Sequence, residues 1–334
     1  MKIGANKNSG DMMDAAQIEI DERSSLAANN KFELMLFRLG VSAGSDQNEV
    51  YGINVFKLRE LMAMPTVNSI ANSPPHVLGM ANIRGQLIPV IDLPAVLGRT
   101  PATGLNILMV TEFARTIQAF AVEEVDEIVR LNWSQVRAAE GAAAGGGTIT
   151  SIAQLDADLN NTRLAQVLDV EQILRNVMPS STPDIDPDTI DSTTRLQPGA
   201  VILAADDSAS ARMLISGCLD AMGLPFVMAK TGLEAWNMLA ELSNAAGKEG
   251  KSADEKVALV LTDLEMPEMD GFTLTKKIKG DPRFSKIPVV IHSSLSGATN
   301  EVHVKSVGAD AYTAKFKAEE LAATLRDVLA KARS

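Results

Sequence analysis

Cysteine, aromatic residues and positive charge are all scarce in this chain of 334 residues. The one cysteine, Cys218, cannot form a disulfide within the chain, which fits a reducing compartment such as the cytoplasm. Lysine and arginine together number 31 against 42 acidic residues, so the formal net charge is −11. Because nucleic-acid binding requires a basic surface, this balance argues against a nucleic-acid partner.

Long apolar runs are also missing. No run approaches the roughly 20 residues that a membrane-spanning helix needs, and the first residues lack the basic-then-apolar pattern of a secretory signal. We therefore expect a cytoplasmic protein without direct membrane insertion. A chain of this length predicts two domains, each long enough to bury a core of its own.

Four apolar runs in the C-terminal half each end at a polar residue. The runs span residues 201–205, 257–262, 287–292 and 309–314, and the polar residues that follow are Asp206 and Asp207, Asp263, Ser293, and Lys315. Such runs are typical of parallel strands that helices cover on both faces. Because the carboxyl ends of parallel strands open onto a shared crevice, we expect these polar groups to meet there.

Three carboxylates in one crevice repel one another, at a cost of about 4 kcal/mol for a pair 4 Å apart at an effective dielectric near 20. Lys315 supplies one positive charge, and a divalent ion held by oxygen atoms, such as Mg²⁺, would offset the rest. A carboxylate beside a metal ion and a lysine is suited to accept a phosphoryl group as an acyl phosphate. Asp263 by itself would be read as a helix-capping aspartate, so this prediction depends on the whole set.

Residues 199–334 resemble the receiver domain of bacterial response regulators. The residues that carry the resemblance are Asp206-Asp207, Asp263, Met266-Pro267-Glu268-Met269-Asp270-Gly271, Ser293, Tyr312 and Lys315. The resemblance implies an α/β flavodoxin-like fold, that is, a doubly wound parallel sheet. A domain of this kind catalyses only its own phosphorylation and dephosphorylation, so no other enzymatic activity is expected.

The same resemblance implies a role for each polar residue. Asp263 is expected to accept the phosphoryl group, and Lys315 to neutralise its charge. Ser293 and Tyr312 are expected to form a switch pair, in which the hydroxyl turns toward the phosphoryl oxygens and the ring follows it inward. The expected protein ligands of Mg²⁺ are Asp206, Asp207, Asp263 and the backbone carbonyl of Glu265.

One departure from the receiver pattern follows Lys315. The family usually has a proline there, joined by a cis bond, whereas here Phe316 comes next. A cis bond costs about 2.5–4 kcal/mol before a non-proline residue, against about 0.5–1 kcal/mol before proline. We therefore predict a trans bond and a reshaped loop that still brings Lys315 to Asp263.

Short alternating runs fill residues 31–177 and predict an all-β, barrel-like domain. The expected strands are residues 32–39, 51–55, 105–110, 116–122, 127–131 and 164–170, with a hairpin over residues 77–93. Residues 56–62 and 171–178 have helical spacing. No nucleophile elbow, metal triad or acid pair at strand ends occurs in this half, so the pattern predicts a binding module.

This N-terminal half resembles the CheW coupling family of bacterial chemotaxis. The resemblance is carried by Tyr51-Gly52-Ile53, Asn82-Ile83-Arg84-Gly85, Ile88-Pro89-Val90-Ile91-Asp92-Leu93 and Leu168-Asp169-Val170-Glu171. It implies two partners, the cytoplasmic tips of chemoreceptors and the regulatory domain of the histidine kinase CheA. Arg84 would lie on an interaction surface, although a solvated arginine in a turn is an equally good reading of the sequence alone.

The remaining segments are polar. Residues 178–198 are rich in Ser, Thr, Asp and Pro and predict a linker, and residues 1–30 predict a polar N-terminal segment. Residues 244–256 read as a solvated insertion. A CheW-like domain over residues 31–177 followed by a receiver over residues 199–334 resembles the architecture of the CheV family.

Two functions fit this organisation. The first is a scaffold at membrane-associated receptor arrays, where it couples chemoreceptors to CheA and is tuned by phosphorylation of Asp263. The second is a phosphate sink that drains phosphoryl groups from the kinase by forming and hydrolysing the acyl phosphate. A short acyl-phosphate lifetime would favour the sink.

Overall fold

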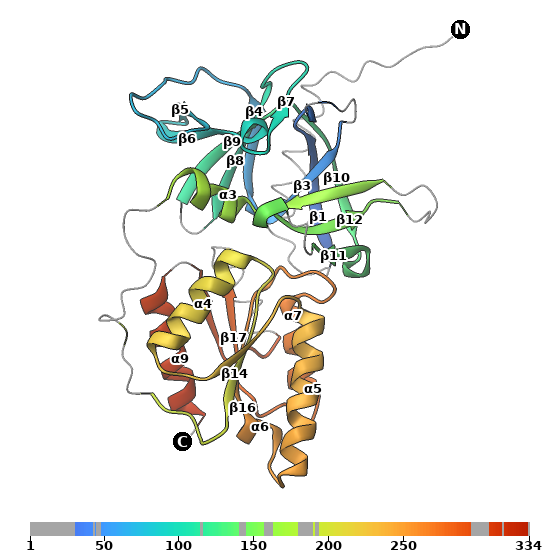
Figure 1. Cartoon of the computed structure of the whole chain (residues 1–334), viewed down its shortest axis with the longest axis vertical. Coiled ribbons are helices and arrows are strands. Elements are labelled where there is room, and N and C mark those ends of the chain that lie inside the picture. Colours follow the sequence, from blue (N-terminus) through green and yellow to red (C-terminus); the bar gives the residue numbers. More distant parts are fainter. Residues whose placement is uncertain are drawn as a thin grey trace. The chain divides into compact units, whose positions relative to one another are not determined.

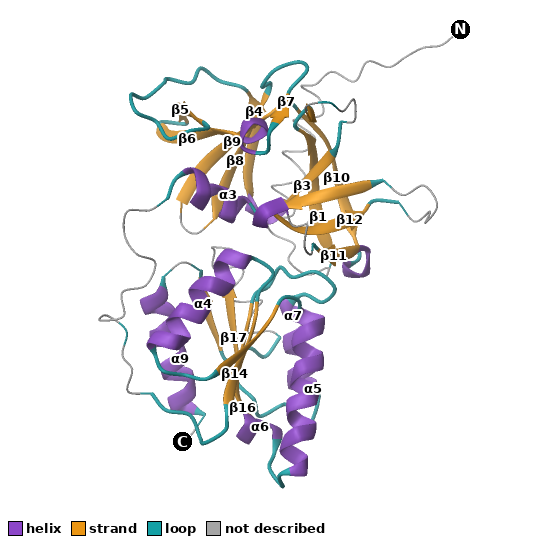
Figure 2. Cartoon of the chain, in the orientation of Figure 1, coloured by secondary structure: helices purple, strands orange, loops and turns teal. Residues whose placement is uncertain are grey.

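The computed structural model contains two compact units, whose helices and strands are shown in Figures 1 and 2. It describes residues 31–42, 44, 48–113, 116–139, 145–156, 163–179, 190, 194–294, 307–315 and 317–332. The predictions for residues 1–30, for most of the linker and for the bond to Phe316 concern residues outside these ranges. Those predictions, and the predicted domain boundaries, stay predictions.

The N-terminal half is rich in β-structure, as predicted. Its larger sheet has the order β10 (Glu124–Leu131), β1 (Phe32–Arg38), β3 (Val50–Asn54), β13 (Leu164–Leu168), β12 (Ile149–Gln154) and β11 (Val136–Ala138). A five-stranded sheet has the order β4 (Leu58–Ala63), β8 (Ile107–Phe113), β9 (Thr116–Val122), β6 (Gln86–Asp92) and β5 (Val77–Ile83). A short ribbon pairs β2 (Val41–Ser42) with β7 (Arg99–Thr100), and the described part of this half also contains the short helices α2 (Leu93–Val96) and α3 (Val170–Val177).

The helix expected over residues 56–62 is wrong. A short 3-10 turn over Val55–Lys57 leads instead into strand β4. The register of β4 against β8 shifts between Leu58 and Glu60. A bulge of this kind interrupts the strict alternation of a strand, so Leu58 and Leu61 are both buried at a spacing of three residues. That spacing imitates a helix in the sequence.

The C-terminal half contains a five-stranded parallel sheet, which confirms the predicted receiver-like fold. Its order is β15 (Phe226–Ala229), β14 (Val201–Ala205), β16 (Val257–Thr262), β17 (Val289–Ser293) and β18 (Ala311–Ala314). Helices α4 (Ala209–Ala221) and α9 (Ala318–Lys331) cover one face of the sheet, and α5 (Gly232–Lys248) and α7 (Gly271–Gly280) cover the other (Figure 1).

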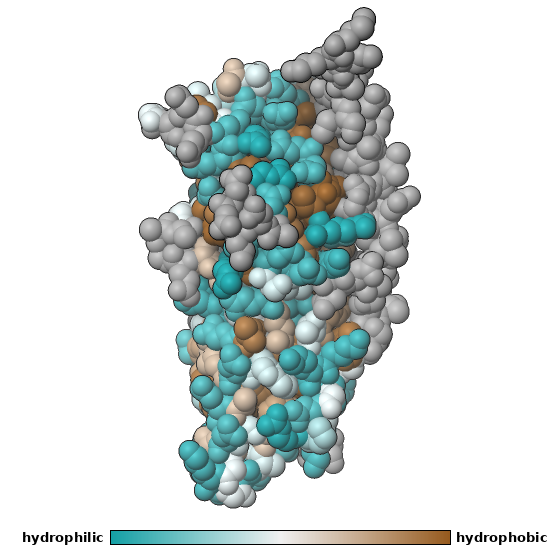
Figure 3. Space-filling view, turned by 90° about the vertical axis from the view of Figure 1, so that its right-hand side faces the viewer, coloured by the Kyte–Doolittle hydropathy of each residue, from teal (hydrophilic) through white to brown (hydrophobic). Residues whose placement is uncertain are grey.

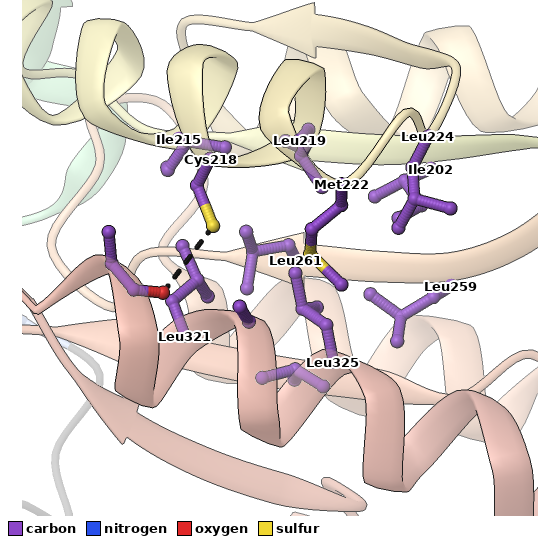
Figure 4. Packing of buried hydrophobic residues seen from close by; sticks show 14 of the residues in the cluster. Ile202, Ile215, Cys218, Leu219, Met222, Leu224, Leu259, Leu261, Leu321 and Leu325 are labelled. Carbon is purple, nitrogen blue, oxygen red and sulfur yellow. Dashed lines mark hydrogen bonds between the residues drawn. The ribbon is translucent and has the colours of Figure 1, made fainter. Parts of the chain in front are cut away.

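A hydrophobic cluster joins the sheet to α4 and α9 (Figure 4). Cys218 lies inside it, and its thiol donates to the carbonyl oxygen of Ala318 at 3.5 Å. Burial raises the pKa of this thiol to about 11, so it behaves as the small buried hydrophobe that the sequence suggested. Ile190, from the predicted linker, is 6% exposed and belongs to the same cluster. The linker is therefore anchored on the C-terminal domain at Ile190.

The segment over residues 244–256 is more helical than we expected. Helix α5 continues to Lys248, and α6 (Ala253–Lys256) follows directly before β16. A capping box between Ser252 and Glu255 starts α6, and Ala246 and Ala253 are buried. In the sequence, the alanines among the polar residues of this segment were the feature that could have indicated this packing.

Large exposed hydrophobic side chains are few in the described part of the chain. They are Ile70, Leu87, Leu164, Met213 and Leu233. Figure 3 shows one face, on which hydrophilic residues cover most of the surface and hydrophobic residues gather in patches. Within the described ranges, no helix is both long and apolar enough to cross a membrane.

Candidate functional site

The ends of β14 and β16 place three carboxylates side by side. These strands are neighbours in the sheet, with Ala205 opposite Thr262, and the Asp263 amide donates to the carbonyl of Ala205 at 2.9 Å. One carboxylate oxygen from each of Asp206, Asp207 and Asp263 lies within 4.8 Å of the others. The structure thus brings together the acids that the sequence placed at separate strand ends.

Lys315 joins this cluster from β18, at the edge of the sheet. Its ammonium donates to Asp263 Oδ2 at 2.8 Å and lies 2.9 Å from Asp206 Oδ2. The lysine is 5% exposed. Burial by itself would lower its pKa, but the charges of Asp206 and Asp263 hold the pKa of Lys315 well above its ordinary value. The cluster therefore contains a permanently charged ammonium.

Asp206 is fully buried, and its electrostatic position is unfavourable. Burial raises its pKa to about 7; Lys315 opposes this rise and the charge of Asp263 adds to it. Its Oδ1 accepts from the Ser208 amide at 3.0 Å. Its Oδ2 is paired with Lys315 by distance but accepts no hydrogen bond of good geometry from any residue that the structure describes. One lysine is not enough to compensate these acids.

The cluster fits a small divalent cation. It offers hard oxygen donors, an excess of negative charge and a buried carboxylate oxygen that accepts no hydrogen bond within the described ranges. Mg²⁺ prefers oxygen ligands of this type. Receiver domains generally bind Mg²⁺ at such a group of aspartates. Glu265 is half-buried in the loop that follows Asp263.

The loop after Asp263 is held closely at both ends. Asp263 Oδ1 accepts from the Leu264 amide at 2.7 Å, and the Gly271 amide donates to the Leu264 carbonyl at 3.0 Å. Asp270 caps α7 by accepting from the Thr273 amide. The loop thus fixes the direction in which the Asp263 carboxylate points.

The expected switch residues lie on neighbouring strands. Ser293 is fully buried at the end of β17, and Tyr312 is half-buried on β18 opposite Ile291. In parallel strands, residues that pair across the ladder share a face, so Ser293 and Tyr312 are diagonal neighbours on one face of the sheet. Most of the segment between them, residues 295–306, lies outside the described ranges.

Two residues of this region escaped the sequence analysis. Arg212 donates to the backbone carbonyls of Asp206 and Asp207, both at 2.8 Å, and so holds the acid pair in place. In the sequence, its position one turn into the helix that follows Asp206 and Asp207 was the feature that could have indicated this role. The second is His292, a buried imidazole next to Ser293. Its place in an apolar strand run, without metal-ligand spacing to another histidine, favoured a structural interpretation.

Arg84 lies at the tip of the β5–β6 hairpin. Arg84 and Gly85 have φ values of 49° and 85°, as expected of the two central residues of a type I′ turn. Glycine adopts this conformation freely, but arginine does so under strain. The Arg84 side chain is 77% exposed and contacts Glu60 at 2.7 Å. Leu87, 68% exposed, follows on β6.

Comparisons with known proteins agree with this arrangement. Residues 33–178 match the CheW-like domain and residues 202–326 match the response regulator receiver domain. The chain is 30% identical to the chemotaxis protein CheV1 of Helicobacter pylori over 335 aligned positions, which cover 93% of this chain and 97% of that protein. The chain belongs to the CheV family of chemotaxis proteins.

Two further known proteins are similar to this CheV-family chain. Chemotaxis protein CheV2 of Helicobacter pylori is 29% identical over 326 positions, which cover 93% of this chain and 99% of that protein. The scaffolding protein TtCheW from Thermoanaerobacter tengcongensis aligns with 42% of this chain and 89% of its own, at 20% identity and a TM-score of 0.35. Both domains of the family are present, and the chain has a role in chemotaxis signalling.

Proposed function

We propose that this CheV-family chain couples chemoreceptors to the histidine kinase CheA and that phosphorylation of Asp263 tunes the coupling. The observation that carries the proposal is the hydrogen bond from the buried Lys315 ammonium to Asp263 Oδ2. This bond holds a positive charge beside the Asp263 carboxylate, where it would neutralise the negative charge of a phosphoryl group. The CheW-like match over residues 33–178 supports the scaffold role.

In the proposed reaction, a carboxylate oxygen of Asp263 attacks the phosphorus of a phosphohistidine on the kinase. A phosphorus–oxygen bond forms, the phosphorus–nitrogen bond breaks, and the imidazole leaves with the electron pair. Asp206, Asp207, Asp263 and the Glu265 carbonyl would hold Mg²⁺, which would neutralise charge on the transferring group. Lys315 would bind a phosphoryl oxygen, and Ser293 and Tyr312 would respond to it.

The N-terminal half would supply the contacts with receptors and kinase. Arg84 is strained, exposed and placed at the tip of a hairpin. Strain that persists at an exposed site motivates a functional hypothesis, and arginine is enriched in protein–protein interfaces. We place the protein at membrane-associated receptor arrays on the cytoplasmic side.

Phosphotransfer from purified CheA tests the proposal. The wild-type chain should become phosphorylated in the presence of Mg²⁺, and Asp263→Asn should not, because an amide cannot form the acyl phosphate. Asp263→Asn should keep the N-terminal domain folded and able to bind receptor and kinase. Kinase activity in receptor complexes should then differ between the unmodified and the phosphorylated chain.

A coupling change of the usual size, about 1–3 kcal/mol, would alter affinity about 5- to 150-fold. If kinase activity is the same with the unmodified and the phosphorylated chain, and the acyl phosphate is hydrolysed rapidly, the chain acts as a phosphate sink and not as a tuned scaffold. If the wild-type chain accepts no phosphoryl group from CheA, both proposed functions are wrong.

A further inference from the structure

His292 is a buried polar side chain that has no hydrogen-bond partner among the described residues. It is 1% exposed on β17, and neither Nδ1 nor Nε2 makes a hydrogen bond within that part of the chain. Native proteins satisfy nearly all buried polar groups, so a buried group left unpaired calls for an explanation. Valine at this position would pack without that cost, and the strand is otherwise apolar up to Ser293.

The sheet register places His292 beside Lys315. His292 is opposite Thr313 on β18, and the Lys315 amide continues the ladder by donating to the Ser293 carbonyl at 3.0 Å. Since side chains alternate between faces along a strand, Thr313 and Lys315 share the face of His292. His292 and Lys315 are therefore diagonal neighbours on the same face.

Lys315 must pass over the strand that carries His292. Its ammonium reaches Asp263 at the end of β16, and β17 lies between β16 and β18 in the sheet. His292 is the last residue of β17 on the face along which the lysine extends. The imidazole thus lies along the course of the lysine side chain toward the acids.

The unused hydrogen-bonding capacity of the two side chains is complementary. An ammonium group has three donors, and among the described residues that of Lys315 makes one hydrogen bond, to Asp263. The Asp206 carboxylate neutralises part of the Lys315 charge but does not accept a well-aligned hydrogen bond from this ammonium. Burial, with the nearby charge of Lys315, lowers the pKa of His292 to about 3. The neutral imidazole that results has one nitrogen able to accept.

We propose that His292 is a positioning residue for Lys315: its neutral imidazole accepts a hydrogen bond from the ammonium when the ammonium leaves Asp206 to bind a phosphoryl oxygen on Asp263. The inference rests on the proposed phosphorylation of Asp263. In this role His292 replaces the partner that Lys315 loses and fixes the ammonium beside the acceptor. The imidazole stays uncharged throughout, because a second cation would repel Lys315.

The test compares His292→Val with His292→Gln, using acetyl phosphate and Mg²⁺ so that no kinase is needed. His292→Val removes the unpaired polar atoms and should raise the urea midpoint of the C-terminal domain. It should also slow phosphorylation of Asp263 about 10-fold, the lower end of the effect seen when a residue that orients a metal ligand is replaced. His292→Gln keeps an acceptor and should restore most of the rate.

Ile291→Val is the matched control, since Ile291 lies on the same strand but on the opposite face. It should lower the urea midpoint and leave the phosphorylation rate unchanged, which separates the rate from stability. A wild-type rate in His292→Val would overturn the positioning role alone. Equal slowing in the valine and glutamine variants would assign His292 a packing role instead. A wild-type chain that is not phosphorylated at Asp263 would overturn the proposed function and this inference together.

Discussion

Gly271 lies against the backbone carbonyl of Asp263: a Cβ added at position 271 would stand 2.0 Å from that oxygen. Carbon and oxygen atoms do not approach so closely without a covalent bond, so any larger residue would displace one of the two backbone segments. The first residue of α7 must therefore lack a side chain so that the helix can pack against the backbone of Asp263, at the end of β16. Glycine is required at this position for space, not for an unusual φ.

Replacing Gly271 by alanine should damage both stability and the acid cluster. We expect Gly271→Ala to lower the free energy of unfolding by about 1–3 kcal/mol, the usual cost of overpacking, and to weaken Mg²⁺ binding because Asp263 is displaced. Urea denaturation and calorimetric titration with Mg²⁺ measure the two effects. The control is Gly280→Ala in the same helix, where an added Cβ meets no atom within 4 Å. An equal response of the two variants would contradict the prediction.

The raised pKa of Asp206 should appear in the pH dependence of stability. Its pKa is about 7 in the folded chain and about 3.9 in an unfolded one, so the folded state binds the proton more tightly. The resulting stabilisation is fully present below about pH 4 and is lost as the pH rises to about 7. Urea unfolding without Mg²⁺ should show this loss when the wild type is compared with Asp206→Asn.

The comparison with Asp206→Asn is needed because His292 acts in the opposite direction. Its folded pKa of about 3 lies below the unfolded value, so its contribution is present above about pH 6.5 and is lost as the pH falls. Lys315 contributes no slope in this range, since its pKa lies well above the ordinary value. If the difference between the two proteins does not change with pH, Asp206 carries no raised pKa.

Arg84 should matter for binding and little for folding. The Arg84 side chain is 77% exposed, whereas the side chain of its partner Glu60 is only 10% exposed, so solvent screens the ion pair on one side and we expect it to contribute about 1 kcal/mol. Arg84→Ala should therefore lower the free energy of unfolding by about 1 kcal/mol, which is too little to unfold the domain. Arg84→Glu should weaken pull-down of receptor–CheA complexes. The control Arg130→Glu changes an exposed arginine on β10 that pairs with Glu33. If both reversals bind as the wild type does, Arg84 is an ordinary surface residue.

Ile190 should stabilise the C-terminal domain although it belongs to the predicted linker. Ile190→Ala removes a side chain that is 6% exposed in the α4–α9 cluster, and should lower the free energy of unfolding of that domain by about 2 kcal/mol. Met213→Ala, at a side chain of α4 that is 76% exposed, should change it by no more than about 0.5 kcal/mol. Urea denaturation of both variants measures the difference. A change at Ile190 as small as that at Met213 would show that this anchor contributes nothing.

The sequence predicted those features that depend on strand ends. Apolar runs stopping at Asp206, Asp263 and Lys315 were enough to predict a parallel sheet and an acid cluster at one edge, because parallel topology brings such ends together. Local exceptions were hidden. The bulge in β4 placed Leu58 and Leu61 at helical spacing, since a one-residue shift in register cancels the alternation on which strand prediction depends.

Long-range contacts could not be read from the sequence. Ile190 is a single apolar residue in a polar segment, and only the folded α4–α9 face explains its burial. His292 resembles any strand residue until the register places it beside Lys315. Arg212 reaches backbone carbonyls, which carry no sequence signal. Each of these contacts depends on the tertiary structure rather than on local pattern.

The anchoring of Ile190 shortens the tether between the two domains. Ile190 follows Val177, the last buried residue of α3, by 13 positions, and such a stretch spans at most about 45 Å when fully extended. A deletion that includes Ile190 or Leu196 would therefore remove packing from the C-terminal domain, whereas a deletion between Val177 and Ile190 would shorten the connection between the two buried residues. Linker variants of this protein need to be designed around Ile190 for that reason.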